Sequence, residues 1–499
     1  MKQLKGFTAS NYDAENWVKL FKDAGARYAV LTSKHHDGVA LWKGNFNHLN
    51  VIDHTPAGRD LVRPFVDALR KNDMKVGLYY SLIDWSYPDY PAFTRNSVRY
   101  QNDPHRWEKF VNFYFGQVNE LSTRYNPDLF WFDGDWEHSA KEWKASALRK
   151  QITGHNPNAI INSRLAGYGD YDTPEQGVPV AVPESPYWEL CMTMNDSWGY
   201  QHNDSNYKTP YQLIWTFVDC ISKGGNLLLD VGPKEDGTLP QEEIDILNAF
   251  GRWTSKHQEA VYGTRKGIPE GHFFGPTALS KNSLTLYLYI DHFPTAPICI
   301  KGLDSEIKNV RIVGSKVKPT IKKENATGTL YISIPENAAD PIMTVVAVDF
   351  AEPLKLKTPS EETSLTRSFI DYLQQDKQWV DKHIPLVGNW QKGISTLHYA
   401  GPSMLSEDKT ILYLLINGKP NGPLVVKGLK NPINRIWVVG NATKLHHRIV
   451  GKLYWSQVPG IVYIDVPERV LDPRGTVIAV LLDGPISLYT EEGQVIENN

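Results

Sequence analysis

The sequence predicts an α/β catalytic region of the (β/α)8 barrel kind, followed by two tandem all-β sandwich domains. Three observations support this fold class. Short apolar stretches alternate with amphipathic helical stretches up to about residue 265, which is the pattern of βα units. Helical periodicity ends there and short alternating strands begin. The sequence after this point then repeats itself. No glycine-rich phosphate-binding motif follows any strand, which disfavours a nucleotide-binding open sheet.

Six strands are expected in the first region. They are short, mostly apolar and bounded by turn residues, which is typical of strands buried on both faces of a parallel sheet. The expected strands are 28–33, 75–81, 128–132, 159–163, 187–192 and 226–231. Helical patterns lie between them, for example at 17–24 and 110–121. Because a barrel of this kind has eight strands, we expect residues 1–265 to form a barrel whose first strand or strands are missing.

The second half is expected to contain two copies of one β-sandwich, at 266–352 and 370–499, joined by a polar linker at 353–369. Lys301-Gly302-Leu303 recurs 126 residues later as Lys427-Gly428-Leu429. After a six-residue insertion, Pro335-Glu336 recurs 132 residues later as Pro467-Glu468. The same register extends back into the preceding helix, so residues 370–499 are interpreted as a repeat of about 253–352.

Composition excludes several classes of function. The 499 residues carry a net charge of −3 and contain no basic run, so we expect no nucleic-acid partner. No window approaches the roughly 18 apolar residues of a membrane span, and the first residues do not have the pattern of a signal peptide. The chain is rich in aromatic residues, with 15 Trp and 25 Tyr. Most are expected in the core, but aromatic rings also suit the apolar faces of sugars.

Polar and aromatic side chains follow the predicted strands, where the functional groups of parallel α/β folds gather. The residues found there are Lys34–Asp37, Tyr79, Tyr80, Asp84, Trp85, Asp133–Glu137, Arg164, Asp170, Asp172, Glu175, Glu189 and Ser197–Tyr200. Glycoside hydrolysis needs two carboxyl groups across one bond, and aromatic, histidine and arginine side chains would bind the sugar. The sequence therefore favours a carbohydrate-cleaving enzyme.

Structural roles remain open for each of these residues. Asp133 could cap a turn, Arg164 could be an ion-pair partner, and Trp198 could belong to the core. Adjacent residues on a strand point to opposite faces, so one of His35 and His36 could be a core histidine. A metal bound with Asp37 is disfavoured, because three adjacent residues seldom share one ion. We expect no metal and no cofactor.

Five motifs make the chain resemble the α-L-fucosidases of glycoside hydrolase family 29. They are Ser33–Gly38 with Leu41-Trp42, Gly77–Ser81 with Asp84-Trp85, Trp131–Gly134, Ser197–Tyr200 and Ser222–Pro233. The resemblance implies an incomplete barrel, a following β-sandwich and a retaining double displacement. By position, it implies Asp133 as the nucleophile and His35, His36, Tyr79, Arg164 and Trp198 as sugar-binding residues. It points to Glu175 as the acid/base residue, with Glu189 as the rival.

The resemblance further implies an exo-acting retaining α-L-fucosidase that removes terminal α-L-fucose from a fucosylated oligosaccharide or glycoconjugate. Family members carry an N-terminal stretch with a His-Trp-Gly strand that this sequence lacks, which agrees with the count of six strands. A non-catalytic carbohydrate-binding protein on a disabled barrel is the alternative. The intact form is expected in the periplasm or outside the cell. Neither the fucosyl linkage nor the oligomeric state is predicted.

Overall fold

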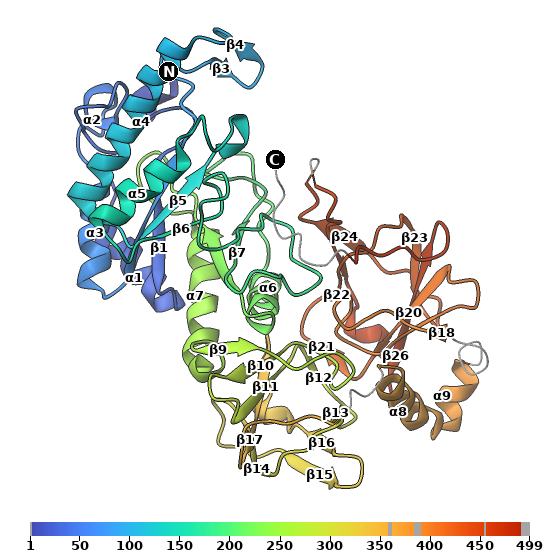
Figure 1. Cartoon of the computed structure of the whole chain (residues 1–499). Helices are drawn as coiled ribbons and strands as arrows, with labels where there is room; N and C mark the ends of the chain where they lie inside the picture. Colours follow the sequence, from blue (N-terminus) through green and yellow to red (C-terminus); the bar gives the residue numbers. More distant parts are fainter. Residues whose placement is uncertain (1, 358–361, 384–390, 454–455, 491–499) are drawn as a thin grey trace.

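A computed structural model describes residues 2–357, 362–383, 391–453 and 456–490 (Figure 1). The chain is mixed α/β in its first half and is built mainly of antiparallel sheets in its second half. None of the helices in these ranges is long and apolar enough to cross a membrane.

All six predicted strands of the first half are present, and they run parallel. Four form one sheet in the order β1 (Tyr28–Lys34), β2 (Lys75–Ser81), β5 (Leu129–Asp133) and β6 (Ile160–Ile161). β7 (Glu189–Thr193) and β8 (Asn226–Asp230) form a second pair. The loop after β6 links the two sheets through parallel bridges from Asn162 to Tyr171 and from Glu175 to Cys191. The strands therefore form one curved parallel array that is open between β1 and β8.

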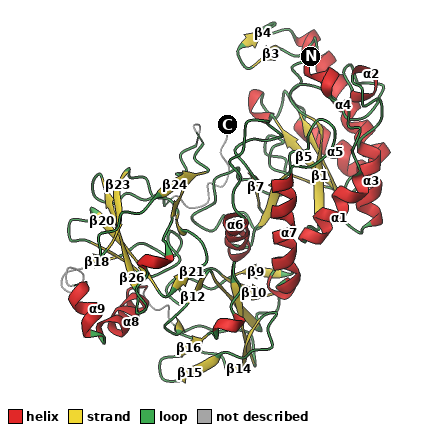
Figure 2. Cartoon of the chain, turned by 180° about the vertical axis from the view of Figure 1, so that it is seen from behind, coloured by secondary structure: helices red, strands yellow, loops and turns green. Residues whose placement is uncertain are grey.

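Helices flank this parallel array, as Figure 2 shows from behind. They are α1 (Ala14–Ala24), the short α2 (Val51–His54), α3 (Val62–Lys71), α4 (Pro104–Tyr125), α5 (Ala145–His155), α6 (Pro210–Ser222) and α7 (Gln241–Lys256). Several begin at sequence-encoded caps: the Asp13 side chain accepts from Asn16 N at the start of α1, and Thr209 and Gln212 form a capping box at α6. The small hairpin β3 (Ala92–Thr94) and β4 (Ser97–Val98) follows β2.

The second half contains two copies of one strand arrangement. In the first, β14-β17-β11-β10-β9 form a five-stranded sheet and β13-β16-β15 a three-stranded one. In the second, β23-β26-β20-β19-β18 and β22-β25-β24 repeat these orders. The first copy comprises β9 (Thr264–Lys266), β10 (Thr277–Ser280), β11 (Thr285–Ile290), β12 (His292–Phe293), β13 (Ile298–Ile300), β14 (Ile307–Ile312), β15 (Thr320–Glu324), β16 (Thr329–Ser333) and β17 (Thr344–Phe350). The second comprises β18 (Gln391–Lys392), β19 (Ser403–Leu405), β20 (Ile411–Ile416), β21 (Lys419–Pro420), β22 (Leu424–Val426), β23 (Ile433–Val438), β24 (His447–Val450), β25 (Ile461–Ile464) and β26 (Thr476–Leu482).

Side-chain contacts repeat along with the strands. Trp253 Nε1 donates to the Met343 carbonyl at 2.9 Å, and Trp379 Nε1 donates to the Gly475 carbonyl at 2.7 Å. The tryptophan pair is offset by 126 residues and the carbonyl pair by 132, which are the two offsets found in the sequence. The same indole therefore anchors the preceding helix to each sandwich.

The polar linker expected at 353–369 needs correction, because part of it is helical. α8 (Glu362–Gln374) begins inside that range and is followed by α9 (Lys377–Lys382). Leu365 and Leu373, two turns apart on one face of α8, are buried, and Leu373 packs in a cluster with Met404 and Val477 of the second sandwich. Because this segment is rich in charged and hydroxyl residues, the narrow apolar face of the helix was not recognised in the sequence.

Candidate functional site

Asp133 is the last residue of β5 and lies at the carboxyl end of the parallel array. Its register partner in β2 is Ser81, and Leu82 N donates to the Asp133 carbonyl at 2.8 Å. Gly134 follows with φ of 86°, a left-handed conformation that turns the chain away from the strand. The Asp133 side chain lines a cavity of about 1470 Å³. This cavity also extends into the opening between β1 and β8.

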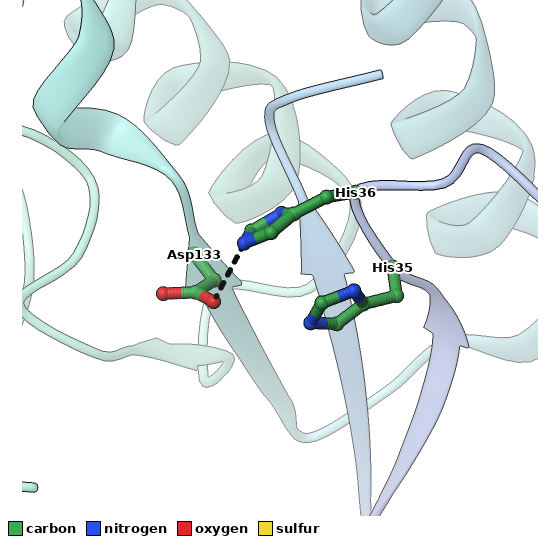
Figure 3. Close-up of side chains that lie close together, drawn as sticks. All are labelled: His35, His36 and Asp133. Atoms are coloured by element: carbon green, nitrogen blue, oxygen red, sulfur yellow. Dashed lines mark ion pairs between the residues drawn. The ribbon is translucent and has the colours of Figure 1, made fainter. Parts of the chain in front are cut away.

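Three side chains surround the Asp133 carboxylate. Arg164 Nη1 donates to Oδ1 at 2.9 Å, and the Tyr79 hydroxyl donates to Oδ2 at 2.7 Å. His36 Nε2 lies 3.7 Å from Oδ2 (Figure 3). Burial disfavours the charged carboxylate, yet Arg164, His36 and Tyr79 together hold the pKa of Asp133 below its ordinary value. The site therefore keeps Asp133 ionised at neutral pH.

His35 and His36 both line the cavity, although His36 is buried and the alternation of strand faces left open that one of them is a core histidine. β1 ends at Lys34, and the chain turns through Gly38, whose N–H donates to the His35 carbonyl at 3.0 Å. The alternation of faces that applies within a strand therefore ends before the two imidazoles. Lys34 is the fully buried residue instead, and its Nζ lies 3.2 Å from Asp84 Oδ2.

The environment of the two histidines fixes the charge of His36. Desolvation by burial, with a further effect from neighbouring His35, lowers the pKa of His36 to about 3. The His36 ring is therefore neutral at physiological pH, and its Nδ1 shares a hydrogen bond with Ser81 Oγ at 2.5 Å. His35 stacks on Tyr79 with ring centroids 5.6 Å apart. Both rings line the cavity beside Asp133.

His35, His36 and Asp133 also form a constellation that has the donor types of a metal site. One ligand atom from each lies within 4.8 Å of the others. The Arg164 guanidinium, however, already contacts Asp133 at 2.9 Å, and a fixed positive charge there opposes a divalent cation. Asp37 does not join the group, since its carboxylate accepts from Val39 N at 2.9 Å. The absence of a metal stays a prediction.

Glu175 reaches the same site from the long loop between β6 and β7. Its segment lies beside β7: Gln176 N donates to the Cys191 carbonyl at 2.9 Å, and Cys191 N donates to the Pro174 carbonyl at 3.0 Å. Arg164 Nη2 donates to Glu175 Oε2 at 2.7 Å. Asp133 and Glu175 therefore bind two nitrogens of one guanidinium, which places the two carboxyl groups within about 8 Å of each other.

Glu189, the rival acid/base residue, faces a different environment. It is buried at the start of β7, accepts from Trp131 Nε1 at 2.9 Å and also accepts from the Tyr28 hydroxyl. Burial raises the pKa of Glu189. It does not line the cavity, whereas Trp131 does, stacking on Tyr79 with Arg164 Cζ 4.6 Å from its ring centre. Glu189 thus fixes the position of the Trp131 ring, which stacks on Tyr79 beside the cavity.

Trp198 lies at the rim of the cavity. Its side chain is half exposed, at 48%, and it lines the cavity from the loop after β7. It is therefore not a core tryptophan. An exposed indole at the entrance to a pocket that contains carboxylates suits contact with the apolar face of a sugar.

Four further cavity-lining residues had no role predicted from the sequence: Trp85, Arg95, Trp136 and Glu137. Trp85 Nε1 is buried and has no hydrogen-bond partner among the described residues. Trp85, Trp136 and Glu137 follow strand ends, so their positions in the sequence already indicated that they could belong to the site. Arg95 carried none, because it lies in the turn between β3 and β4.

Comparisons with known proteins agree on one family. The sequence profile described as Alpha-L-fucosidase matches residues 1–259. Tissue alpha-L-fucosidase of Bos taurus is 32% identical over 305 residues, which are 58% of this chain and 62% of the bovine protein. Plasma alpha-L-fucosidase of Homo sapiens is 32% identical over 271 residues, 52% of this chain and 56% of the human one. The chain thus spans less than two thirds of these relatives.

Solved structures give the same result. Alpha-L-fucosidase isoenzyme 1 from Paenibacillus thiaminolyticus superposes with a TM-score of 0.65 at 33% identity, covering 70% of this chain and 89% of that one. An alpha-L-fucosidase of glycoside hydrolase family 29 from Bacteroides thetaiotaomicron, trapped as a covalent intermediate with 2-fluoro-fucosyl fluoride, gives 0.63 at 27% identity, covering 72% and 85%.

Proposed function

Because the chain belongs to the alpha-L-fucosidase family, we propose that it is an exo-acting, retaining α-L-fucosidase that acts on fucosylated oligosaccharides or glycoconjugates. The observation that carries this proposal is the pair of carboxyl groups, Asp133 and Glu175, on one guanidinium inside a large cavity. Retaining hydrolysis needs one ionised carboxylate and one proton-donating carboxyl group on either side of the glycosidic bond.

In the proposed first step, Asp133 Oδ attacks the anomeric carbon of terminal fucose. The bond to the glycosidic oxygen breaks, and Glu175 donates its proton to that oxygen as the leaving group departs. In the second step, Glu175 takes a proton from water, and the water oxygen attacks the anomeric carbon and releases Asp133. The chemistry needs only carboxylates and water, so no cofactor or metal is proposed.

Arg164 would balance charge through both steps. Before reaction it stabilises the Asp133 anion, and its second nitrogen contacts Glu175 at 2.7 Å. Once Asp133 forms an ester its charge is lost, and Glu175 becomes the anion after donating its proton. One buried guanidinium is thus placed to pair with whichever carboxylate is charged.

The sugar-binding residues are proposed to be His35, His36, Tyr79, Arg164 and Trp198. The two histidines and Tyr79 cluster at the Asp133 end of the cavity, and Trp198 lies at its rim. This arrangement supports an exo mode of action, since polar side chains gather around Asp133 and a half-exposed aromatic ring lines the same cavity.

The finer architecture also belongs to this proposal. The parallel order of β1, β2, β5 and β6 and of β7 and β8 supports a (β/α)8-like barrel over 1–265. The repeated sheet orders support sandwich domains at about 266–352 and 370–499. A periplasmic or extracellular site of action is proposed on the weaker ground that one human relative is named as a plasma enzyme.

Replacing Asp133 with glycine tests the proposal. We expect the Asp133→Gly variant to lose at least about a thousand-fold in kcat on an aryl α-L-fucoside. Azide should restore turnover by attacking from the vacated side, giving a fucosyl azide. The matched control is Asp37→Asn, which changes a nearby carboxylate whose contact is with its own turn at Val39 N. Full activity in the Asp133 variant would remove this residue from the mechanism, and a wild-type chain that binds fucosides without cleaving them would favour the carbohydrate-binding alternative.

A further inference from the structure

The two sandwich copies differ at one hairpin, and that difference accounts for the six-residue insertion in the sequence repeat. In the first copy, β15 ends at Glu324 and β16 begins at Thr329, so residues 325–328 form a short turn. In the second copy, β24 ends at Val450 and β25 begins at Ile461, so the corresponding connection is ten residues long, of which 451–453 and 456–460 are described. The second copy therefore carries a longer hairpin at an otherwise equivalent position.

The long hairpin packs on the segment that carries Glu175. A Cβ placed on Gly177 would lie 3.4 Å from Val458 Cγ1. A Cβ placed on Gly451 would lie 3.2 Å from the Gln176 carbonyl oxygen. Both residues after Glu175 are thus in contact with the hairpin.

The flanking residues continue this contact. Val178 is buried in one hydrophobic cluster with Val425, Ile461 and Tyr463, which come from β22 and β25 of the second sandwich. By contrast, the short turn of the first sandwich stays within its own domain, where a Cβ on Gly328 would meet the Leu303 carbonyl at 2.3 Å. Among the residues that the structure describes, contacts of this kind with the loop between β6 and β7 come from the second copy.

A chain of buried polar contacts reaches the same loop from the same domain. Lys427 Nζ donates to Asp219 Oδ1 at 2.8 Å, and Lys223 Nζ donates to Asp219 Oδ2 at 2.5 Å. Lys223 Nζ also donates to the Pro179 carbonyl at 2.7 Å. The equivalent lysine of the first sandwich, Lys301, donates to Ser368 Oγ at 2.7 Å instead. Lys427 and Lys301, although equivalent in the repeat, therefore donate to different residues.

We propose that the 451–460 hairpin is a positioning element for Glu175 and a determinant of leaving-group specificity. The proposal rests on the proposed function, because Glu175 is taken as the residue that protonates the glycosidic oxygen. That oxygen belongs to the leaving group, and Glu175 lines the cavity, so a shift of the segment that carries Glu175 would alter protonation of the leaving group. The second sandwich therefore supports the segment that carries Glu175, whereas, among the described residues, the first sandwich does not contact this segment through its equivalent turn.

A swap between the two copies tests this role in the full chain. Residues 451–460 are replaced by Asn-Ala-Thr-Gly, the 325–328 turn, which already closes the equivalent hairpin. kcat/KM is measured on an activated aryl α-L-fucoside and on a fucosyl disaccharide. We expect a loss of about ten-fold or more on the disaccharide, which needs protonation of its leaving group, and a change of less than about three-fold on the aryl substrate. The control lengthens the first-sandwich turn with the 451–460 sequence and should alter neither value.

Hydrogen–deuterium exchange of residues 172–180 gives a readout that does not depend on activity. Exchange should become faster in the swapped chain and stay unchanged in the control. If the swap does not fold, Val458→Ser should give the same two effects at smaller size. Equal losses on both substrates, or unchanged exchange, would overturn the proposal. If the wild-type chain cleaves neither fucoside, the proposed function fails, and the exchange result still decides whether the hairpin positions the loop.

Discussion

Arg164 bridges the two carboxyl groups of the site. The sequence placed Arg164, Asp133 and Glu175 after strand ends, but spacing along the chain could not show that one guanidinium contacts both acids, at 2.9 and 2.7 Å. The reason is that Glu175 approaches through a loop whose path is set by pairing with β7 rather than by its own residues. The types of residue were predictable, and their shared partner was not.

The contrast between Glu175 and Glu189 gives a prediction at this scale. Glu175→Ala should lower kcat/KM by about 10²–10⁴-fold on a fucosyl disaccharide and far less on an activated aryl fucoside, because only a poor leaving group needs a proton. Glu189→Ala should lower both by similar factors, since Glu189 contacts Trp131 and Tyr28 beneath the site. The measurement is steady-state kinetics on both substrates with each variant.

The two variants control for each other, as one removes a half-buried glutamate beside β7 and the other a buried glutamate within it. A selective loss on the disaccharide in the Glu189 variant, with an even loss in the Glu175 variant, would transfer the acid/base role to Glu189.

Among the secondary-structure elements, the apolar strands were predictable and the helix of the linker was not. Strands such as β2 and β5 are buried runs with turn residues at both ends, and the sequence shows both features. The second half of the expected linker, by contrast, folds as α8, whose burial depends on contacts with the second sandwich. A helix stabilised by distant residues has a weak local signal.

The start of α7 gives a prediction about pH and stability. Both oxygens of the Glu243 carboxylate accept from Gly232 N, at 3.1 and 3.2 Å. Burial raises the pKa of Glu243 from 4.5 to about 8. Because the folded pKa lies above the unfolded one, the stability contributed by this group is complete below about pH 4.5 and is lost as the pH rises through 8.

Replacing Glu243 with glutamine keeps an acceptor for Gly232 N and removes the charge. Between about pH 5 and pH 9, the Tm of the wild-type chain should fall relative to that of Glu243→Gln. Glu242→Gln, which changes an exposed glutamate in the same turn, should follow the wild type at every pH. A constant difference in Tm between wild type and the Glu243 variant would show that this carboxyl does not titrate in the range.

In the whole molecule, the repeat was visible in the sequence but the use of the second copy was not. Offsets of 126 and 132 residues predicted two equivalent sandwiches, and the two sets of sheet orders agree with them. Contact between the second sandwich and α6, however, depends on Lys427 and Asp219, which are 208 residues apart. A pattern that compares the two copies with each other carries no information about how each copy contacts the first half of the chain.

The last prediction concerns the stability of this interface. Asp219, Lys223 and Lys427 are each at most 5% exposed, the Asp219 carboxylate pairs with both lysines, and burial lowers the pKa of Lys427 to about 7. Asp219→Asn would leave two buried ammonium groups facing each other, and we expect it to lower the free energy of unfolding by about 3 kcal/mol or more. Lys427→Met would leave a neutral pair of Asp219 and Lys223. The Met side chain would pack near Trp215, whose ring lies 5.4 Å from Lys427 Nζ, so we expect less than half of that loss.

Urea unfolding of the full chain, followed by tryptophan fluorescence, measures both variants. A loss in Lys427→Met equal to or greater than that in Asp219→Asn would show that the lysine is held by packing rather than by its charge.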